Sequence, residues 1–143
     1  MTERDYWLHH MKEPEITSWR GIAFEEVCLQ HIQQIKMALQ IAGVASNETS
    51  LIVNGEDGAE GMQIDLLIDR ADDIVNVCEM KYSKSNYVMK KSYAEKLQRR
   101  IDSLEQIQPD KTYHLTFVTV NPMDRNAHSD IVTSTITADE LFR

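Results

Sequence analysis

The chain has 143 residues, of which 42% are hydrophobic and 27% are charged, and its formal net charge is −8. These values are typical of one globular domain that is large enough to bury a core without disulfides or structural metal ions. The two cysteines support no disulfide framework. Since no run approaches ~20 apolar residues and the N-terminus is polar, we expect no membrane span, no signal peptide and a cytoplasmic protein.

The N-terminal part of the chain predicts one long helix. Residues 1–16 show no clear period and are interpreted as a lead-in or linker segment before a domain over residues 17–143. Thr17 or Ser18 can cap a helix that runs to about residue 42. The apolar side chains of this helix form one broad stripe: Phe24, Val27, Cys28, Leu29, Ile32, Ile35, Ala38 and Leu39.

Glu25 lies inside this apolar stripe, whereas its neighbour Glu26 projects outside it. A carboxylate on a buried face is costly unless it is paired or bound to a metal. Glu25 is therefore either an acid at the rim of the core, paired with a lysine, or a member of a functional site.

The stretch over residues 61–81 predicts a hairpin, after a short strand at residues 51–53. Apolar and polar residues alternate in its first strand, a polar turn follows at residues 70–73, and the second strand is expected over residues 74–81. One face of the first strand is expected to carry Met62, Ile64, Leu66 and Ile68, and the other Gln63, Asp65, Leu67 and Asp69.

If this hairpin is symmetric about Asp72, Asp65 lies opposite Glu79, with ~5 Å between the two Cβ atoms. Lys81 is two residues beyond Glu79 and projects on the same face. Because like charges placed opposite each other destabilise a sheet, something should compensate them, and a divalent cation is the obvious candidate. An ordinary hairpin with a charged end fits the same spacing.

The rest of the chain predicts a second helix over about residues 89–106 and strands over residues 111–120 and 130–137. A final helical turn follows, with Leu141 and Phe142 packing back. Short connections make the first three strands antiparallel, and the crossover through the second helix favours parallel pairing afterwards. The predicted class is α/β, with a mixed β-sheet flanked by helices.

Positive charge is concentrated next to the hairpin, because residues 81–100 contain seven lysines and arginines and one glutamate. A local basic stripe on an acidic domain can track a phosphate backbone, although a solvated helix face gives the same pattern. The exposed side of the second helix is expected to carry Lys90, Lys91, Lys96, Arg99 and Arg100. The candidates for nucleic-acid binding are Lys84, Lys90, Lys91, Arg99 and Arg100.

Asp65 and Glu79 offer hard oxygen ligands, which suit Mg²⁺ or Mn²⁺. The carbonyl of Met80 can be a third ligand, and Glu25 a fourth. Such a cation polarises a phosphoryl oxygen and lowers the pKa of a bound water. Lys81 would stabilise charge on the scissile phosphate or help to orient and deprotonate that water. The set suits phosphodiester hydrolysis, and no nucleotide-binding loop motif is present.

This order of elements, with an acid on the first helix, an aspartate on the second strand and Glu79-Met80-Lys81 on the third, resembles the PD-(D/E)XK nuclease superfamily over about residues 17–137. Residues 19–25, 63–70 and 78–81 look like the C-terminal nuclease-like domain of a family of prokaryotic AAA-type ATPases. In those proteins a P-loop ATPase precedes this domain. The resemblance implies a restriction-endonuclease-like αβββαβ core with one further C-terminal strand.

The resemblance also implies roles for single residues. Asp65 and Glu79 would bind the metal, Lys81 would stabilise charge, and Glu25 would be an accessory acid. Gln63, assigned to the same strand face as Asp65, would contact the metal-bound water or the phosphate. The superfamily's proline before the aspartate is Ile64 here.

The implied function is Mg-dependent hydrolysis of DNA by a domain that follows an ATPase, with a homodimer as one way to cut both strands. Two alternatives stay open. One is a catalytically inactive nucleic-acid-binding or regulatory module of an ATPase, and the other is a protein-interaction domain with a vestigial site.

Overall fold

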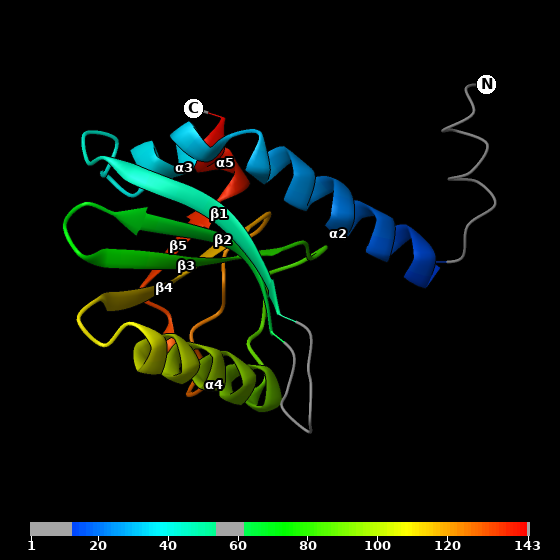
Figure 1. Ribbon diagram of the computed structural model, residues 1–143. Coiled ribbons are helices and arrows are strands. Elements are labelled where there is room, and N and C mark those ends of the chain that lie inside the picture. Colours follow the sequence, from blue (N-terminus) through cyan, green and yellow to red (C-terminus); the bar gives the residue numbers. More distant parts are fainter. Residues whose placement is uncertain (1–12, 54–61, 143) are drawn as a thin grey trace.

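The computed structural model of the chain describes residues 13–53 and 62–142. A mixed sheet of five strands, in the order β1-β2-β3-β4-β5, lies between two layers of helices (Figure 1). The strands are β1 (Ser46–Val53), β2 (Met62–Arg70), β3 (Ile74–Lys81), β4 (Thr112–Thr119) and β5 (Ser134–Thr137). The helices are α2 (Glu13–Leu29), α3 (Ile32–Ala38), α4 (Lys91–Ile107) and α5 (Ala138–Leu141), with a 3₁₀ turn at Ser129–Ile131. The predicted α/β class, a mixed sheet flanked by helices, is confirmed.

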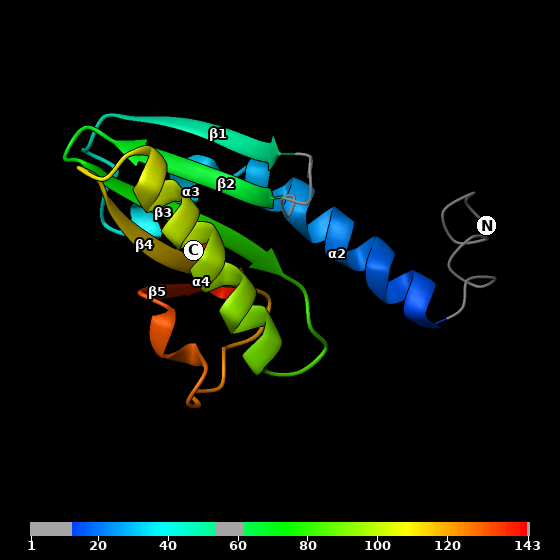
Figure 2. The ribbon, with the colours of Figure 1, turned by 60° about the horizontal axis from the view of Figure 1, so that its bottom comes forward.

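The pairing of the strands follows the lengths of their connections. The first three strands pair antiparallel, whereas β3 and β4, and then β4 and β5, pair parallel. Helix α4 makes the crossover between β3 and β4, and Figure 2 shows it lying across one face of the sheet. The antiparallel meander and the later parallel pairing were both predicted, and both are confirmed.

The predicted single helix over residues 17–42 is wrong, because the chain forms two helices. Helix α2 begins at Glu13, inside the segment interpreted as a lead-in, which a proline in the first helical turn permits. The helix ends at Leu29, and His31 leaves helical geometry, with φ −123° and ψ 35°. The rest of that lead-in segment, residues 1–12, lies outside the described residues.

The outer strands also differ from the prediction. The first strand starts at Ser46 instead of residue 51, because its polar half also pairs with β2. The expected strand over residues 130–137 is shorter, and the 3₁₀ turn replaces its first part. That turn is stabilised by Asn126, whose Oδ1 accepts hydrogen bonds from the backbone N–H groups of the two residues before Asp130.

The final helical turn is present as α5, with a capping box between Thr137 and Glu140. Leu141 is buried as expected, but Phe142 is exposed and contacts the ring of His31 edge-on, at 5.1 Å between centroids.

Two apolar clusters fill the space on the two faces of the sheet. Helices α2, α3 and α5 cover one cluster, which includes Leu66 and Ile68 of β2, and α4 covers the other, which includes Ile64. The predicted strict alternation along β2 is therefore wrong between Ile64 and Leu66. The register explains this: Thr49 pairs with Leu67, but two residues further along β1 the partner is Ile64, three residues away. The second strand thus carries one extra residue, a β-bulge, at Asp65 and Leu66.

Candidate active site

The β-bulge places Asp65 at the centre of the candidate site. The backbone carbonyl of Asp65 accepts a hydrogen bond from Ser50 Oγ at 2.7 Å. Its side-chain Oδ2 accepts a hydrogen bond from the backbone N–H of Met80 at 3.0 Å. Leu66 pairs with Cys78, as the symmetric hairpin predicted, so the same register brings Asp65 level with Glu79. The carboxylate of Asp65 therefore replaces a ladder hydrogen bond and lies against β3.

Glu79 is 2% exposed and is held from α4 by both of its carboxylate oxygens. Its Oε1 accepts a hydrogen bond from Arg100 Nη1 at 3.0 Å, and its Oε2 accepts one from the hydroxyl of Tyr93 at 2.8 Å. Burial and then the nearby charge of Asp65 raise the pKa of Glu79, while the Tyr93 hydrogen bond and the charges of Lys81 and Arg100 lower it.

The predicted position of Arg100 on the exposed side of the second helix is wrong. Its side chain is 12% exposed and forms the ion pair with Glu79. Arg100 follows Tyr93 by seven positions, which is close to two helical turns, so both side chains face the sheet from one side of α4. This spacing was the signal in the sequence that could have placed Arg100 with Tyr93 and not with the surface lysines.

Lys81 follows Glu79 at the end of β3 and is half-buried. Its ammonium group lies 4.6 Å from the centroid of the Tyr93 ring, which is a cation–π distance. Because Tyr93 also donates its hydroxyl to Glu79, one aromatic side chain of α4 contacts both charged residues of the Glu79-Met80-Lys81 segment.

Glu25 reaches the site from α2. Its side chain is half-buried, whereas that of Glu26 is exposed, as expected from the apolar stripe. Burial raises the pKa of Glu25, the charge of Asp65 raises it further, and the charge of Lys81 lowers it. Asp65 and Lys81 are therefore close enough for their charges to act on Glu25.

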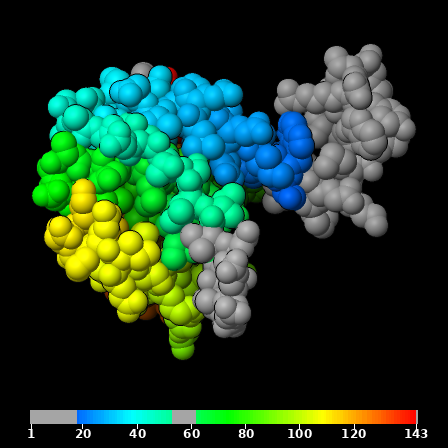
Figure 3. Space-filling model, viewed as in Figure 1, coloured from blue at the N-terminus to red at the C-terminus, as the bar shows by residue number. Residues whose placement is uncertain are grey.

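All of these side chains line one cleft of about 380 Å³ between α2, the ends of β2 and β3, and α4. The residues of this cleft that sequence reasoning predicted as site residues are Glu25, Gln63, Asp65, Glu79, Met80 and Lys81. Those it did not assign to the site are Ser18, Gly21, Ile22, Tyr82, Tyr93 and Lys96. Arg100, which was predicted on the exposed surface of the second helix, also lines the cleft. In the space-filling view, α2 extends away from the rest of the described molecule (Figure 3).

The other basic candidates lie outside the cleft. Lys84 is exposed in the loop after β3, Lys90 and Lys91 are exposed at the start of α4, and Arg99 is exposed further along it. Lys91 approaches Glu95 at 4.0 Å on the helix surface. Lys96 is half-buried and lines the cleft itself.

The donor chemistry of the cleft fits a hard cation in part. Within residues 13–53 and 62–142, no three His, Cys, Asp or Glu side chains form a group that could hold a metal ion as they stand. Magnesium, however, commonly takes one or two carboxylates and completes its shell with water and phosphate oxygens. Asp65 and Glu79 supply such a pair, and each Glu79 oxygen accepts one hydrogen bond and keeps acceptor capacity. Met80 lines the cleft, where its N–H contacts Asp65.

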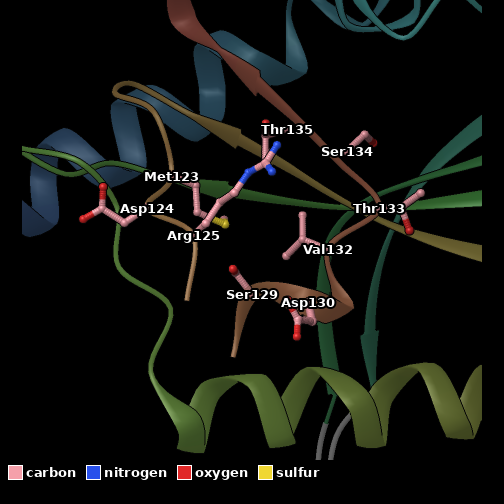
Figure 4. A pocket seen from close by; sticks show the side chains of 9 residues that line it. All are labelled: Met123, Asp124, Arg125, Ser129, Asp130, Val132, Thr133, Ser134 and Thr135. Carbon is pink, nitrogen blue, oxygen red and sulfur yellow. The ribbon is translucent and has the colours of Figure 1, made fainter. Parts of the chain in front are cut away.

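A second cavity, which sequence reasoning did not predict, lies beside β5 (Figure 4). It measures about 370 Å³ and is lined by residues 123–125, 129, 130 and 132–135. Its charged side chains are Asp124, Arg125 and Asp130, which leave a net negative lining.

No family model matches the chain, and no curated protein matches it. Among solved structures, the chain is similar to a crystal structure of a protein of unknown function, AF1548, at 17% sequence identity and a TM-score of 0.48. The similarity covers 74% of this chain and 56% of that protein, so the chain spans little more than half of its length. In the part of the chain that the structure describes, no helix is long and apolar enough to cross a membrane.

Proposed function

We propose that this chain is a metal-dependent nuclease domain that hydrolyses phosphodiester bonds in DNA. The observation that carries the proposal is that three carboxylates and a lysine, from α2, β2 and β3, line one cleft. Two of these carboxylates, Asp65 and Glu79, form the kind of pair that magnesium commonly takes, and the half-buried Lys81 beside them favours an anionic substrate.

Each side chain has a role in this proposal. Asp65 and Glu79 would hold Mg²⁺ or Mn²⁺, which when bound would polarise a phosphoryl oxygen and lower the pKa of a bound water. Lys81 would stabilise the negative charge that develops on the scissile phosphate. Glu25, which lines the cleft together with Asp65 and Lys81, would be the accessory acid, and Gln63 would donate a hydrogen bond to the phosphate or to water.

The surface around the cleft supports a polyanionic substrate. Lys84, Lys90, Lys91 and Arg99 are exposed on the loop and helix that follow β3, and Lys96 lies in the cleft wall. We propose that these cations contact the DNA backbone, and that Arg100 does not, because it is paired with Glu79. From the sequence resemblance, we also propose that the domain works in one chain with an ATPase.

The test is cleavage of plasmid and branched DNA with Mg²⁺ or Mn²⁺. Cleavage is expected to fall by at least ~10²-fold in Asp65→Asn, which loses a carboxylate that would hold the metal, and in Lys81→Ala, which loses the cation that would stabilise the phosphate. Asp130→Asn, an exposed aspartate beside the second cavity, is the matched control and is expected to cut like the unmodified protein. Robust cleavage by both cleft variants would refute the site assignment.

A second candidate function is a nucleic-acid-binding module without catalysis. The Glu79–Arg100 ion pair favours it, because Arg100 already compensates a carboxylate that a metal would otherwise neutralise. This candidate predicts salt-dependent DNA binding that Mg²⁺ does not change, and no cleavage of any substrate.

A further inference from the structure

We propose that Tyr93 and Arg100 are positioning residues that fix the orientation of the Glu79 carboxylate for metal binding. The inference rests on the proposed function and assigns a role to two side chains of α4. Neither residue offers an oxygen that a hard cation would take in preference to carboxylates, so both act through Glu79.

Each of the two donors binds a different oxygen of the Glu79 carboxylate. Arg100 Nη1 donates to Oε1 and the Tyr93 hydroxyl donates to Oε2, at 3.0 Å and 2.8 Å. The terminal torsion of a glutamate is broad and roughly two-fold, so an unanchored carboxylate samples many orientations. One donor on each oxygen removes this freedom and leaves acceptor capacity on both atoms for a ligand in the cleft.

The two donors are themselves held in place. Tyr93 is in contact with the Lys81 ammonium through its ring, and Arg100 is 12% exposed between α4 and the sheet. Both belong to a helix whose buried residues Ala94, Leu97, Ile101 and Leu104 pack on the sheet. Partners of this kind, which orient a metal ligand without touching the metal, typically change metal affinity 10–100-fold when they are removed.

Tyr93→Phe tests the inference with a change of one hydroxyl group. The matched control is Tyr113→Phe, because the Tyr113 hydroxyl contacts the C-terminal end of α4, where it donates to the carbonyls of Leu104 and of the C-cap residue Gln108, at 3.1 Å each. Each variant loses a tyrosine hydroxyl that links α4 to a strand of the sheet. Only Tyr93→Phe removes a hydrogen bond to the Glu79 carboxylate.

The measurement is titration calorimetry of the full chain with Mn²⁺ alone. Tyr93→Phe is expected to weaken Mn²⁺ binding by about tenfold, while Tyr113→Phe stays within about twofold of the unmodified protein. Arg100→Lys keeps the charge and loses the rigid fork, so it is also expected to weaken binding. In cleavage assays, the half-saturating Mg²⁺ concentration of Tyr93→Phe should rise by about tenfold, with the rate at saturating Mg²⁺ within about threefold.

The outcomes distinguish a failure of the positioning role from a failure of the proposed function. If the unmodified protein binds Mn²⁺ and Tyr93→Phe binds it equally well, the positioning role is wrong and the metal site remains. If both tyrosine variants weaken binding equally, the effect is general to α4 and the positioning role is also wrong. If the unmodified protein binds no Mn²⁺, both the proposed function and the positioning role fail.

Discussion

Glu25 is a carboxyl group that the fold makes harder to ionise. Burial is the main cause of its raised pKa, and the charge of Asp65 adds to it. A carboxyl group whose pKa is higher in the folded than in the unfolded state favours folding while it is protonated. That contribution is fully present below the unfolded pKa, near 4.5, and is lost as the pH rises through the higher folded pKa.

Glu25→Gln is therefore expected to raise the melting temperature near neutral pH in metal-free buffer. The gain should disappear below the unfolded pKa, where the native carboxyl group is protonated in both states. The exposed neighbour provides the control, since Glu26→Gln should leave the melting temperature unchanged at both pH values. An unchanged melting temperature for Glu25→Gln near neutral pH would show that the ionised carboxylate carries no cost.

Gly21 is a helical residue that lines the cleft without a side chain of its own. Apart from its two chain neighbours and the nearby backbone of its own helix, a Cβ atom at this position would meet no atom of the described residues within 4 Å. Glycine inside a helix costs roughly 0.5–1 kcal/mol relative to alanine. Gly21→Ala is therefore expected to raise the free energy of unfolding by about that amount, measured by urea denaturation. A loss of stability would mean that the backbone at Gly21 is not regular helix.

At the scale of elements, the β-bulge in β2 is the feature that the sequence could not reveal. Alternation is a pattern of side-chain polarity, and both Ile64 and Leu66 are apolar, so each satisfies a buried position on either face. The insertion becomes visible only through the pairing with β1, where the partner of Leu51 is Ile64. The hairpin register was predictable, because a short turn defines it, but the exact position of Asp65 was not.

Helix α4 shows a similar limit. Its apolar stripe and its basic surface were both predictable from the helical period. The buried position of Arg100 was not predictable, because an arginine is assigned to the surface unless a buried partner is known. The partner is Glu79, which is close to α4 only after the chain has folded.

A row of polar side chains crosses four neighbouring strands of the sheet. Arg70 donates to Asn76 at 3.2 Å, Asn76 donates to Thr116 at 3.1 Å, and the hydroxyls of Thr116 and Ser134 are 2.9 Å apart. Asn76 and Thr116 are both buried, so each depends on its neighbours to satisfy its polar atoms.

Asn76→Ala would interrupt this row at its centre and leave the Thr116 hydroxyl with one partner fewer. Leaving buried polar groups without partners costs about 1–3 kcal/mol, so the free energy of unfolding is expected to fall by that amount. Asn86→Ala is the control, because its 3.0 Å hydrogen bond to Asp124 is exposed. Chemical denaturation of the two variants measures the difference, and equal losses would contradict the role of burial.

At the scale of the whole molecule, the parts predicted correctly are those with a strong local signal. The order of helices and strands, the antiparallel meander and the crossover all follow from periodicity and connection length. The missed parts depend on tertiary contacts, such as the polar half of β1 that pairs as an edge strand. The sequence located Asp65, Glu79, Lys81 and Glu25 in one cleft, but the donors that hold Glu79 required the structure.

The structure also shows which groups compensate the negative charge in the cleft. The sequence led to a divalent cation as the obvious partner for two facing carboxylates. In the structure, Arg100 pairs with Glu79, and the charge of Lys81 acts on both Glu79 and Glu25. The protein's own cations therefore offset part of the repulsion between Asp65 and Glu79. Charge repulsion alone does not require a metal, and the Mn²⁺ titration described above tests metal binding directly.

The distribution of charge gives the last prediction. The chain is acidic overall, at −8, but seven of its fifteen lysines and arginines lie between Lys81 and Arg100, so the proposed DNA binding should depend on a few local cations. Lys91→Ala removes one exposed cation at the start of α4 and is expected to lower the slope of log affinity against log salt by about one.

Lys111→Ala is the matched control for this prediction. The Lys111 ammonium lies beyond the other end of α4 and is paired with Asp69 at 3.0 Å and Asp73 at 3.7 Å, so its loss should leave the slope unchanged. The measurement is fluorescence anisotropy of labelled DNA over a range of salt concentrations. Equal slopes for both variants and the unmodified protein would exclude Lys91 from the DNA contact, because counterion release counts the cations that touch phosphate.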